Sequence, residues 1–152
     1  MNAALVMPGE GGSRRDSLMA SKDLDSGKEE RRRTVLIVDD EHLIADTLAD
    51  ILNNTGSFVA TAVYDGASAL ERVRNTGFDV LITDVVMPEM NGIELAKAIK
   101  SISPKTRIVL LSGQAETRDL VAQAKHEGHG FELWAKPMHP EVILERLKQG
   151  PV

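Results

Sequence analysis

Carboxylates, a hydroxyl and an amine each directly follow an aliphatic run in this sequence. In chain order these residues are Asp39, Asp40, Glu41, Asp84, Ser112 and Lys136. Carboxylates that are packed together repel one another and call for a divalent cation, and all-oxygen ligands suit a hard ion such as Mg²⁺. A carboxylate beside Mg²⁺ that faces an amine and a hydroxyl can attack phosphorus, and the resulting acyl phosphate would be stabilised.

Each of these residues has an ordinary structural explanation when it is taken alone. An acidic residue after a strand is usually a helix N-cap. A lysine at such a place is usually solvated, and a serine is usually a turn residue. The combination, with one chemical group after each of several aliphatic runs, favours a shared site.

The elements that must position these groups can be predicted from the alternation of apolar patterns after residue 33. Short aliphatic runs predict strands at 34–38, 58–63, 80–83, 108–111 and 131–135. Amphipathic stretches predict helices at 41–54, 67–74, 92–102, 116–127 and 140–149. Five such units in about 119 residues predict a parallel sheet with helices on both faces. Ligands of such folds bind outside the carboxyl ends of the strands, so the polar groups should converge there.

Composition limits the classes of protein to which the chain can belong. Its 152 residues fit one domain with a tail, and 42% hydrophobic and 27% charged residues exclude wholesale disorder. Aromatic residues make up only 3%, so the core must be aliphatic. The net charge of −5 argues against direct nucleic-acid binding. The absence of cysteine excludes disulfides and thiolate chemistry.

We expect residues 1–33 to form a disordered tail and residues 34–150 to form the folded domain. The tail is rich in glycine and serine and has few large aliphatic residues, so it cannot bury enough apolar surface to offset its ordering entropy. The basic run 31–33 is interpreted as a solvated junction. The sequence has no signal peptide and no apolar run long enough to cross a bilayer, so we expect a soluble, cytoplasmic protein.

Four motifs resemble the receiver domain of bacterial two-component response regulators. They are residues 35–41 (VLIVDDE), 79–92 (DVLITDVVMPEMNG), 108–113 (IVLLSG) and 136–137 (KP). The resemblance covers residues 34–149. It implies an α/β fold of the flavodoxin-like (βα)5 type, a doubly wound parallel five-stranded sheet in the order 2-1-3-4-5.

The resemblance also implies a phosphorylation site that depends on Mg²⁺. Asp84 matches the phosphoacceptor of the family. Asp39 and Asp40 match its acidic pair, which binds Mg²⁺ together with Asp84, and Asp40 is expected to be the more direct ligand of the pair. The backbone carbonyl of Val86 would complete the protein ligands.

Two further matches concern the phosphorylated state. Ser112 matches the hydroxyl that bonds a phosphoryl oxygen, and Lys136 matches the amine that pairs with another. Gly113 is small, which leaves a path for a phosphodonor. The family usually has a cis peptide bond before the proline that corresponds to Pro137. The chain departs from the pattern at Leu133, where the family usually has an aromatic switch residue.

The implied function is that of a stand-alone receiver, because the chain ends directly after its last predicted helix. Its phosphodonor would be a histidine kinase or a histidine phosphotransfer protein. A downstream protein would contact the surface formed by residues 116–127, 131–135 and 140–149. We expect no nucleic-acid contact, no membrane insertion, and a monomer or a phosphorylation-dependent dimer. Catalysis would be limited to self-phosphorylation and autodephosphorylation at Asp84.

Other functions are less well supported by the sequence. A phosphatase of the haloacid-dehalogenase type requires Asp-x-Asp after its first strand, whereas this strand is followed by Asp-Asp-Glu-His at 39–42. A flavin carrier of the flavodoxin type requires a phosphate loop rich in Ser, Thr and Gly there, and acidic residues would repel the phosphate. A receiver that only binds partners is a smaller possibility. The four histidines lack metal-ligand spacing and are interpreted as surface or capping residues.

Overall fold

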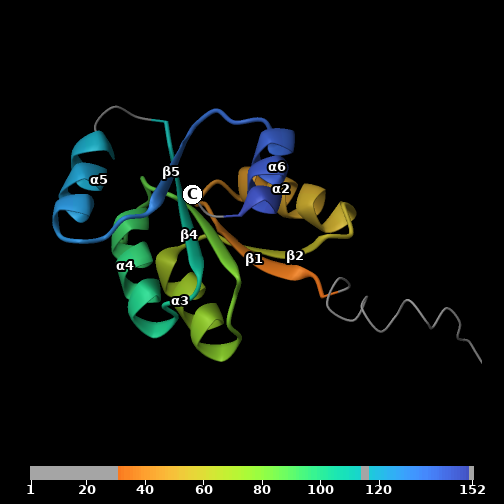
Figure 1. The fold of residues 1–152 in the computed structure, drawn as a ribbon, viewed down its shortest axis with the longest axis horizontal. Coiled ribbons are helices and arrows are strands. Elements are labelled where there is room, and N and C mark those ends of the chain that lie inside the picture. The colour runs from red at the N-terminus through yellow and green to blue at the C-terminus, as the bar shows by residue number, and fades with distance from the viewer. Residues whose placement is uncertain (1–30, 114–116, 151–152) are drawn as a thin grey trace, which may run out of the picture. The chain divides into compact units, whose positions relative to one another are not determined.

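The computed structural model describes residues 31–113 and 117–150, within which five strands alternate with five helices (Figure 1). The strands are β1 (Arg33–Val38), β2 (Phe58–Val63), β3 (Val80–Asp84), β4 (Arg107–Ser112) and β5 (Glu132–Ala135). The helices are α2 (His42–Asn54), α3 (Gly66–Asn75), α4 (Gly92–Ile102), α5 (Thr117–His126) and α6 (Pro140–Gln149). The predicted alternation of strands and helices is therefore confirmed, with element ends that differ by at most one residue.

The strands form one parallel sheet in the order β2-β1-β3-β4-β5. The chain passes from β1 outward to the edge strand β2 and then back to β3 on the other side of β1. The strand order therefore reverses between β1 and β3, which is where ligands bind in folds of this kind. This is the predicted flavodoxin-like order, and it places the carboxyl ends of β1 and β3 next to each other.

Helices cover both faces of the sheet and enclose two aliphatic cores (Figure 1). One core lies between the sheet and helices α2 and α6, and the other lies between the sheet and helices α3, α4 and α5. Side chains alternate along a strand, so Ile82 of β3 joins the first core and Leu81 joins the second. Each fully buried aliphatic side chain contributes about 1.5–3 kcal/mol of transfer free energy.

Strand β1 begins one residue earlier than the predicted run 34–38. The Arg33 backbone N–H donates to the Ser57 carbonyl over 3.4 Å, and the Arg33 guanidinium lies 5.3 Å from the centroid of the Phe58 ring. Its Nη2 also donates to the Leu147 carbonyl at 2.7 Å. Arginine can pack its aliphatic stem and its guanidinium against a folded domain. The charge of the run 31–33 alone does not predict such a contact. Residues 1–30 of the predicted tail lie outside the described residues.

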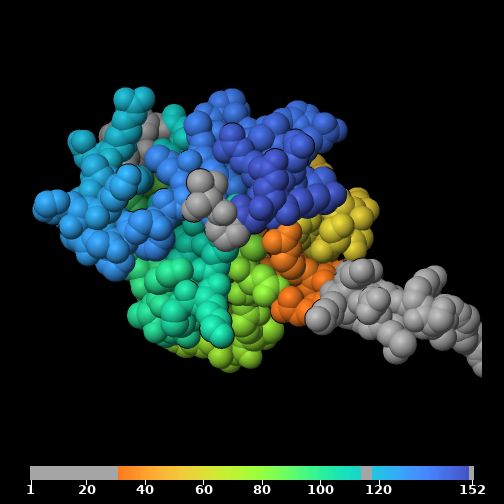
Figure 2. Space-filling view, in the orientation of Figure 1, coloured from red at the N-terminus to blue at the C-terminus, as the bar shows by residue number. Residues whose placement is uncertain are grey.

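Helix α5 is held to the domain by fewer buried side chains than its neighbours. Ala124 is buried, whereas Leu120 is 39% exposed. An ion pair at 2.6 Å joins Lys97 of α4 to Glu127, just after α5. In the space-filling view α5 lies at the margin of the domain (Figure 2). Within the described ranges, no helix combines the length and apolar character that a bilayer crossing requires.

Candidate phosphorylation site

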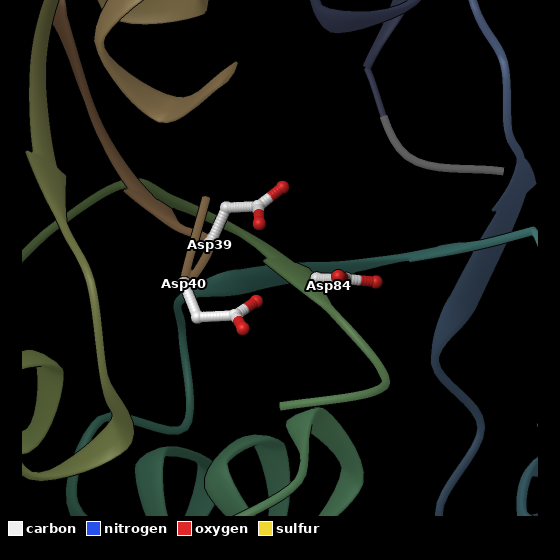
Figure 3. A group of neighbouring side chains, drawn as sticks. All are labelled: Asp39, Asp40 and Asp84. Atoms are coloured by element: carbon white, nitrogen blue, oxygen red, sulfur yellow. The ribbon is translucent and has the colours of Figure 1, made fainter. Parts of the chain in front are cut away.

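Three carboxylates meet at the carboxyl ends of β1 and β3. Asp39 and Asp40 directly follow β1, and Asp84 is the last residue of β3. Each of the three offers an oxygen atom that lies within 4.8 Å of the others, and Figure 3 shows the carboxylates projecting toward the same side of the strand ends. The parallel pairing of β1 with β3 brings the two strand ends level. The predicted convergence of these residues is therefore observed.

The three carboxylates differ in their exposure to solvent. Asp39 is buried, with only 3% of its surface exposed, and its Oδ1 accepts a hydrogen bond from the Glu41 backbone N–H at 3.0 Å. Asp84 is half-buried, and Asp40 is exposed. All of these ligand atoms are oxygens, and the exposed side of the cluster at Asp40 leaves room for water. Such a site suits Mg²⁺, a hard divalent cation that keeps several of its water molecules. The donor set therefore fits Mg²⁺.

Lys136 supplies the positive charge of the site. Its Nζ lies 3.5 Å from Oδ2 of Asp84 and 3.7 Å from Oδ2 of Asp39. The Lys136 backbone N–H donates to the Ser112 carbonyl at 2.9 Å, which carries the β4–β5 pairing one residue beyond the strand. The Lys136–Pro137 peptide is cis, as the family resemblance implied.

The surroundings of Asp84 shift its ionisation. Burial raises the pKa of the Asp84 carboxyl above its ordinary value. The Lys136 ammonium opposes this by lowering the pKa, and the Asp39 carboxylate raises the pKa again. The net direction is upward, so the ionised form of Asp84 is unfavourable in the protein without a cation. A bound divalent cation would relieve this strain.

Gly113 lies at the same opening, directly after Ser112 at the end of β4. Ser112 ends β4 and pairs in register with Ala135 of β5. Gly113 follows it, and a Cβ at that position would lie 3.1 Å from Cβ of Lys136, which is a tight contact. A pocket of about 420 Å³ opens at this place. It is lined by Asp40, Glu41, Asp84, Val86, Gly113 and Lys136.

Strand β5 shows the departure that the sequence indicated. Trp134 is buried in the core with α2 and α6, and Phe131 packs against the opposite core. Leu133 points away from the Trp134 side and is 43% exposed. In the pairing of β4 with β5, Leu110 lies opposite Leu133 and Ser112 lies opposite Ala135, so this register places no aromatic side chain opposite Ser112.

Sequence reasoning missed an apolar groove beside the site. It has a volume of about 400 Å³ and shares Lys136 with the acidic pocket. Its wall includes Leu43 and Ile44 of α2, which are 79% and 41% exposed. The signal could have come from Leu43, which lies outside the i, i+3, i+4, i+7 spacing of the buried residues of α2, Ala45, Leu48, Ala49 and Leu52.

The histidines have the ordinary roles that were predicted for them where contacts are described. His139 is the N-cap of α6, and its Nδ1 accepts a hydrogen bond from the Glu141 backbone N–H at 3.1 Å. The His42 ring stacks on Tyr64, with ring centroids 3.7 Å apart.

Comparisons with known proteins agree with this geometry. The family model described as "Response regulator receiver domain" matches residues 35–148. The chemotaxis protein CheY of Thermotoga maritima is 32% identical over 117 residues, which cover 77% of this chain and 96% of the relative. CheY of Bacillus subtilis is 31% identical, with 76% and 94% coverage. The crystal structure of CheY4 from Vibrio cholerae gives a TM-score of 0.69 at 30% identity and covers 78% of this chain and 98% of that chain.

Proposed function

This chain belongs to the response regulator receiver domain family of two-component systems, and we propose that Asp84 is the residue that accepts its phosphoryl group. The family acts as a phosphoacceptor in signalling and is not a family of conventional enzymes. The observation that carries the assignment is the position of Asp84. It lies at the end of a central strand, in reach of two further carboxylates and of the Lys136 ammonium.

The proposed reaction transfers a phosphoryl group to the Asp84 carboxylate. One carboxylate oxygen attacks phosphorus, an oxygen–phosphorus bond forms, and the bond from phosphorus to the donor nitrogen or oxygen breaks. The electron pair of that bond leaves with the donor. The half-buried position of Asp84 limits the access of competing water, and the open pocket beside it admits the donor.

We assign the Mg²⁺ ligands to Asp39, Asp40, Asp84 and the backbone carbonyl of Val86. When bound, Mg²⁺ would neutralise charge on the transferring phosphoryl oxygens. Val86 lines the acidic pocket, which supports a role for its backbone there. Asp39 is oriented by the Glu41 backbone N–H, so this carboxylate is held in place before any ion binds.

Ser112 and Lys136 are proposed to act on the phosphorylated form. A phosphoryl group on Asp84 adds oxygens that carry negative charge, and Lys136 already lies 3.5 Å from that carboxylate. Ser112 lies on the adjacent strand, and a hydroxyl there can donate to another phosphoryl oxygen. Movement of these two residues would carry the state of the site to β4 and β5.

The proposed phosphodonor is a histidine kinase or a histidine phosphotransfer protein, acting in the cytoplasm, where ATP-derived phosphoryl groups are available. The proposed output is a protein partner that binds the surface formed by α5, β5 and α6. The exposed Leu120 and Leu133 on this surface support a protein contact. We further propose that the receiver is a monomer or dimerises on phosphorylation, and that it does not bind nucleic acid itself.

Loading with a small phosphodonor tests the proposal. Wild-type protein with acetyl phosphate and Mg²⁺ should gain the mass of one phosphoryl group in intact mass spectrometry. Asp84→Asn should gain none, and a chelator should prevent loading of the wild type. Glu89→Gln, in the same loop, is the matched control and should load normally. Full loading of Asp84→Asn, or loading that ignores the chelator, would contradict the assignment.

A further inference from the structure

Thr83 is a buried residue that no step of the proposed reaction uses. Among the described residues, the polar or charged ones that are buried are Asp39, Thr83 and Thr106, and Thr83 is fully buried. It lies in β3 between Leu81 and Val85 of one aliphatic core, so its side chain faces that core. A buried hydroxyl loses its hydration and requires a hydrogen-bond partner to offset that loss. Valine has nearly the same shape as threonine and lacks this requirement.

The partner of this hydroxyl is the backbone carbonyl of the proposed phosphoacceptor. Thr83 Oγ1 donates to the Asp84 carbonyl oxygen at 3.0 Å. The same carbonyl also touches Gly92 at the start of α4. A Cβ on Gly92 would lie 2.1 Å from this oxygen and 2.9 Å from its carbon, so only glycine fits. The Asp84 peptide is therefore in contact with both Thr83 and Gly92.

This peptide determines where the functional groups of the loop point. It joins Asp84 to Val85, and the Val86 carbonyl follows one residue later. The N–H of this same peptide, which is that of Val85, donates to the Leu111 carbonyl at 3.1 Å, and the Val85 carbonyl of the next peptide accepts from the Gly92 N–H at 2.8 Å. The Asp84 peptide is therefore held at its N–H by Leu111 and at its carbonyl by Thr83, and its orientation sets how the carboxylate and the Val86 carbonyl are presented to a cation.

We propose that Thr83 is a positioning residue for phosphoryl transfer. Its hydroxyl orients the Asp84 peptide and, through that peptide, the carboxylate and the Val86 carbonyl toward the divalent cation. Thr83 touches neither the donor nor the ion. The inference rests on the proposed function of Asp84 and adds a residue to it.

The comparison of Thr83→Val with Thr83→Ser in the full chain tests this role. Calorimetry would give the Mg²⁺ affinity, and a titration with acetyl phosphate would give the maximal loading rate and the half-saturating donor concentration. Thr83→Val should weaken Mg²⁺ binding roughly three- to tenfold, the effect of one lost hydrogen bond. Its maximal loading rate should fall by a similar factor. Thr83→Ser keeps the hydroxyl and should restore both values.

Thr106→Val is the matched control. Thr106 is buried at the opposite end of the sheet, where its hydroxyl donates to the Phe78 carbonyl at 2.8 Å. This substitution should lower the melting temperature and leave Mg²⁺ affinity unchanged. If Thr83→Val does not fold, Thr83→Ala removes the same hydroxyl and is judged by the same comparison.

Two results would overturn the inference. One is wild-type Mg²⁺ affinity and loading in the Thr83→Val protein, and the other is a Thr83→Ser protein as impaired as Thr83→Val. Should the wild-type chain take no phosphoryl group at all, the proposed function fails. The Mg²⁺ affinities of the variants would still decide the role of Thr83 in that case.

Discussion

At the scale of single residues, the site combines charges that oppose one another when it holds no cation. Asp39 is buried beside Asp84, and Lys136 lies within 4 Å of both carboxylates without fully balancing them. The pKa of Asp84 is therefore raised above its ordinary value, and burial of the carboxyl is the main cause. The same clustered charges that destabilise the fold without a cation favour the binding of a cation and a phosphoryl group.

The first prediction concerns stability without Mg²⁺. Because its pKa is raised in the folded state, ionised Asp84 destabilises the fold at pH above that folded-state pKa. Asp84→Asn should therefore raise the melting temperature at neutral pH by a few degrees. The gain should fade as the pH falls through the folded-state pKa toward the unfolded one. Thermal melts in chelator from neutral to acidic pH measure this, and a gain that grows toward acid would contradict it.

The second prediction concerns Lys136 and Ser112. Both variants, Lys136→Ala and Ser112→Ala, should still accept phosphate from acetyl phosphate, and loss of the lysine should slow loading by roughly tenfold or more. Neither should pass the change on to α5, which hydrogen exchange in that helix can follow on phosphorylation. Lys148→Ala, on the exposed side of α6, is the control. A full wild-type hydrogen-exchange response of α5 in both variants would show that the assigned roles are wrong.

At the scale of elements, β5 determines how a signal can leave the site. Leu133 occupies the position of the usual aromatic switch, and it has no ring that could move toward Ser112. Trp134 is fixed in the opposite core, where the guanidiniums of Arg107 and Arg146 lie 5.9 Å and 5.6 Å from its ring centroid. The effect of phosphorylation should therefore reach the output surface through the loop after Ser112 and through α5. Few buried side chains hold α5 against the domain.

The third prediction follows from this arrangement. In the presence of a phosphoryl mimic such as beryllofluoride, Phe131→Ala and Trp134→Phe should each retain most of the hydrogen-exchange change in α5. Leu133→Ala should reduce partner binding without affecting loading, because its exposed side chain lies on the proposed output surface. If Phe131→Ala or Trp134→Phe alone abolishes the response while the site still loads, an aromatic switch operates after all.

The elements also show how far the sequence could predict the structure. Aliphatic runs and helix periodicity identified each strand and helix of the described residues, because each buried face imposes its own spacing. The polar residues after those runs identified the carboxylates, Ser112 and Lys136. The role proposed for Thr83 could not be predicted, because threonine is common in strands and its type alone indicates no function. The contacts of Arg33 with Phe58 and Leu147 join residues that are far apart in sequence, so only the fold reveals them.

At the scale of the whole molecule, the folded domain begins at Arg33, and the side chain of this residue contacts the rest of the domain. The Arg33 guanidinium packs over Phe58 and donates to the last turn of α6. The predicted tail was placed at 1–33, so a truncation should spare this residue.

The fourth prediction concerns that truncation. Deletion of residues 1–32 should leave the melting temperature within a few degrees and the loading rate unchanged, because it removes none of the described core. Additional replacement of Arg33 by alanine should lower the melting temperature further. Thermal melts of the two proteins make the comparison, and a large loss of stability from the 1–32 deletion alone would mean that the tail packs on the domain.

The central claim is that Asp84, and no other carboxylate of the cluster, carries the phosphoryl group. Borohydride reduces an acyl phosphate and marks the residue that held it, so the mark can be located by peptide mass spectrometry after loading with acetyl phosphate. We predict that the mark lies on Asp84 alone and disappears when Mg²⁺ is chelated. A mark on Asp39 or Asp40, or an unchanged yield in chelator, would contradict the account.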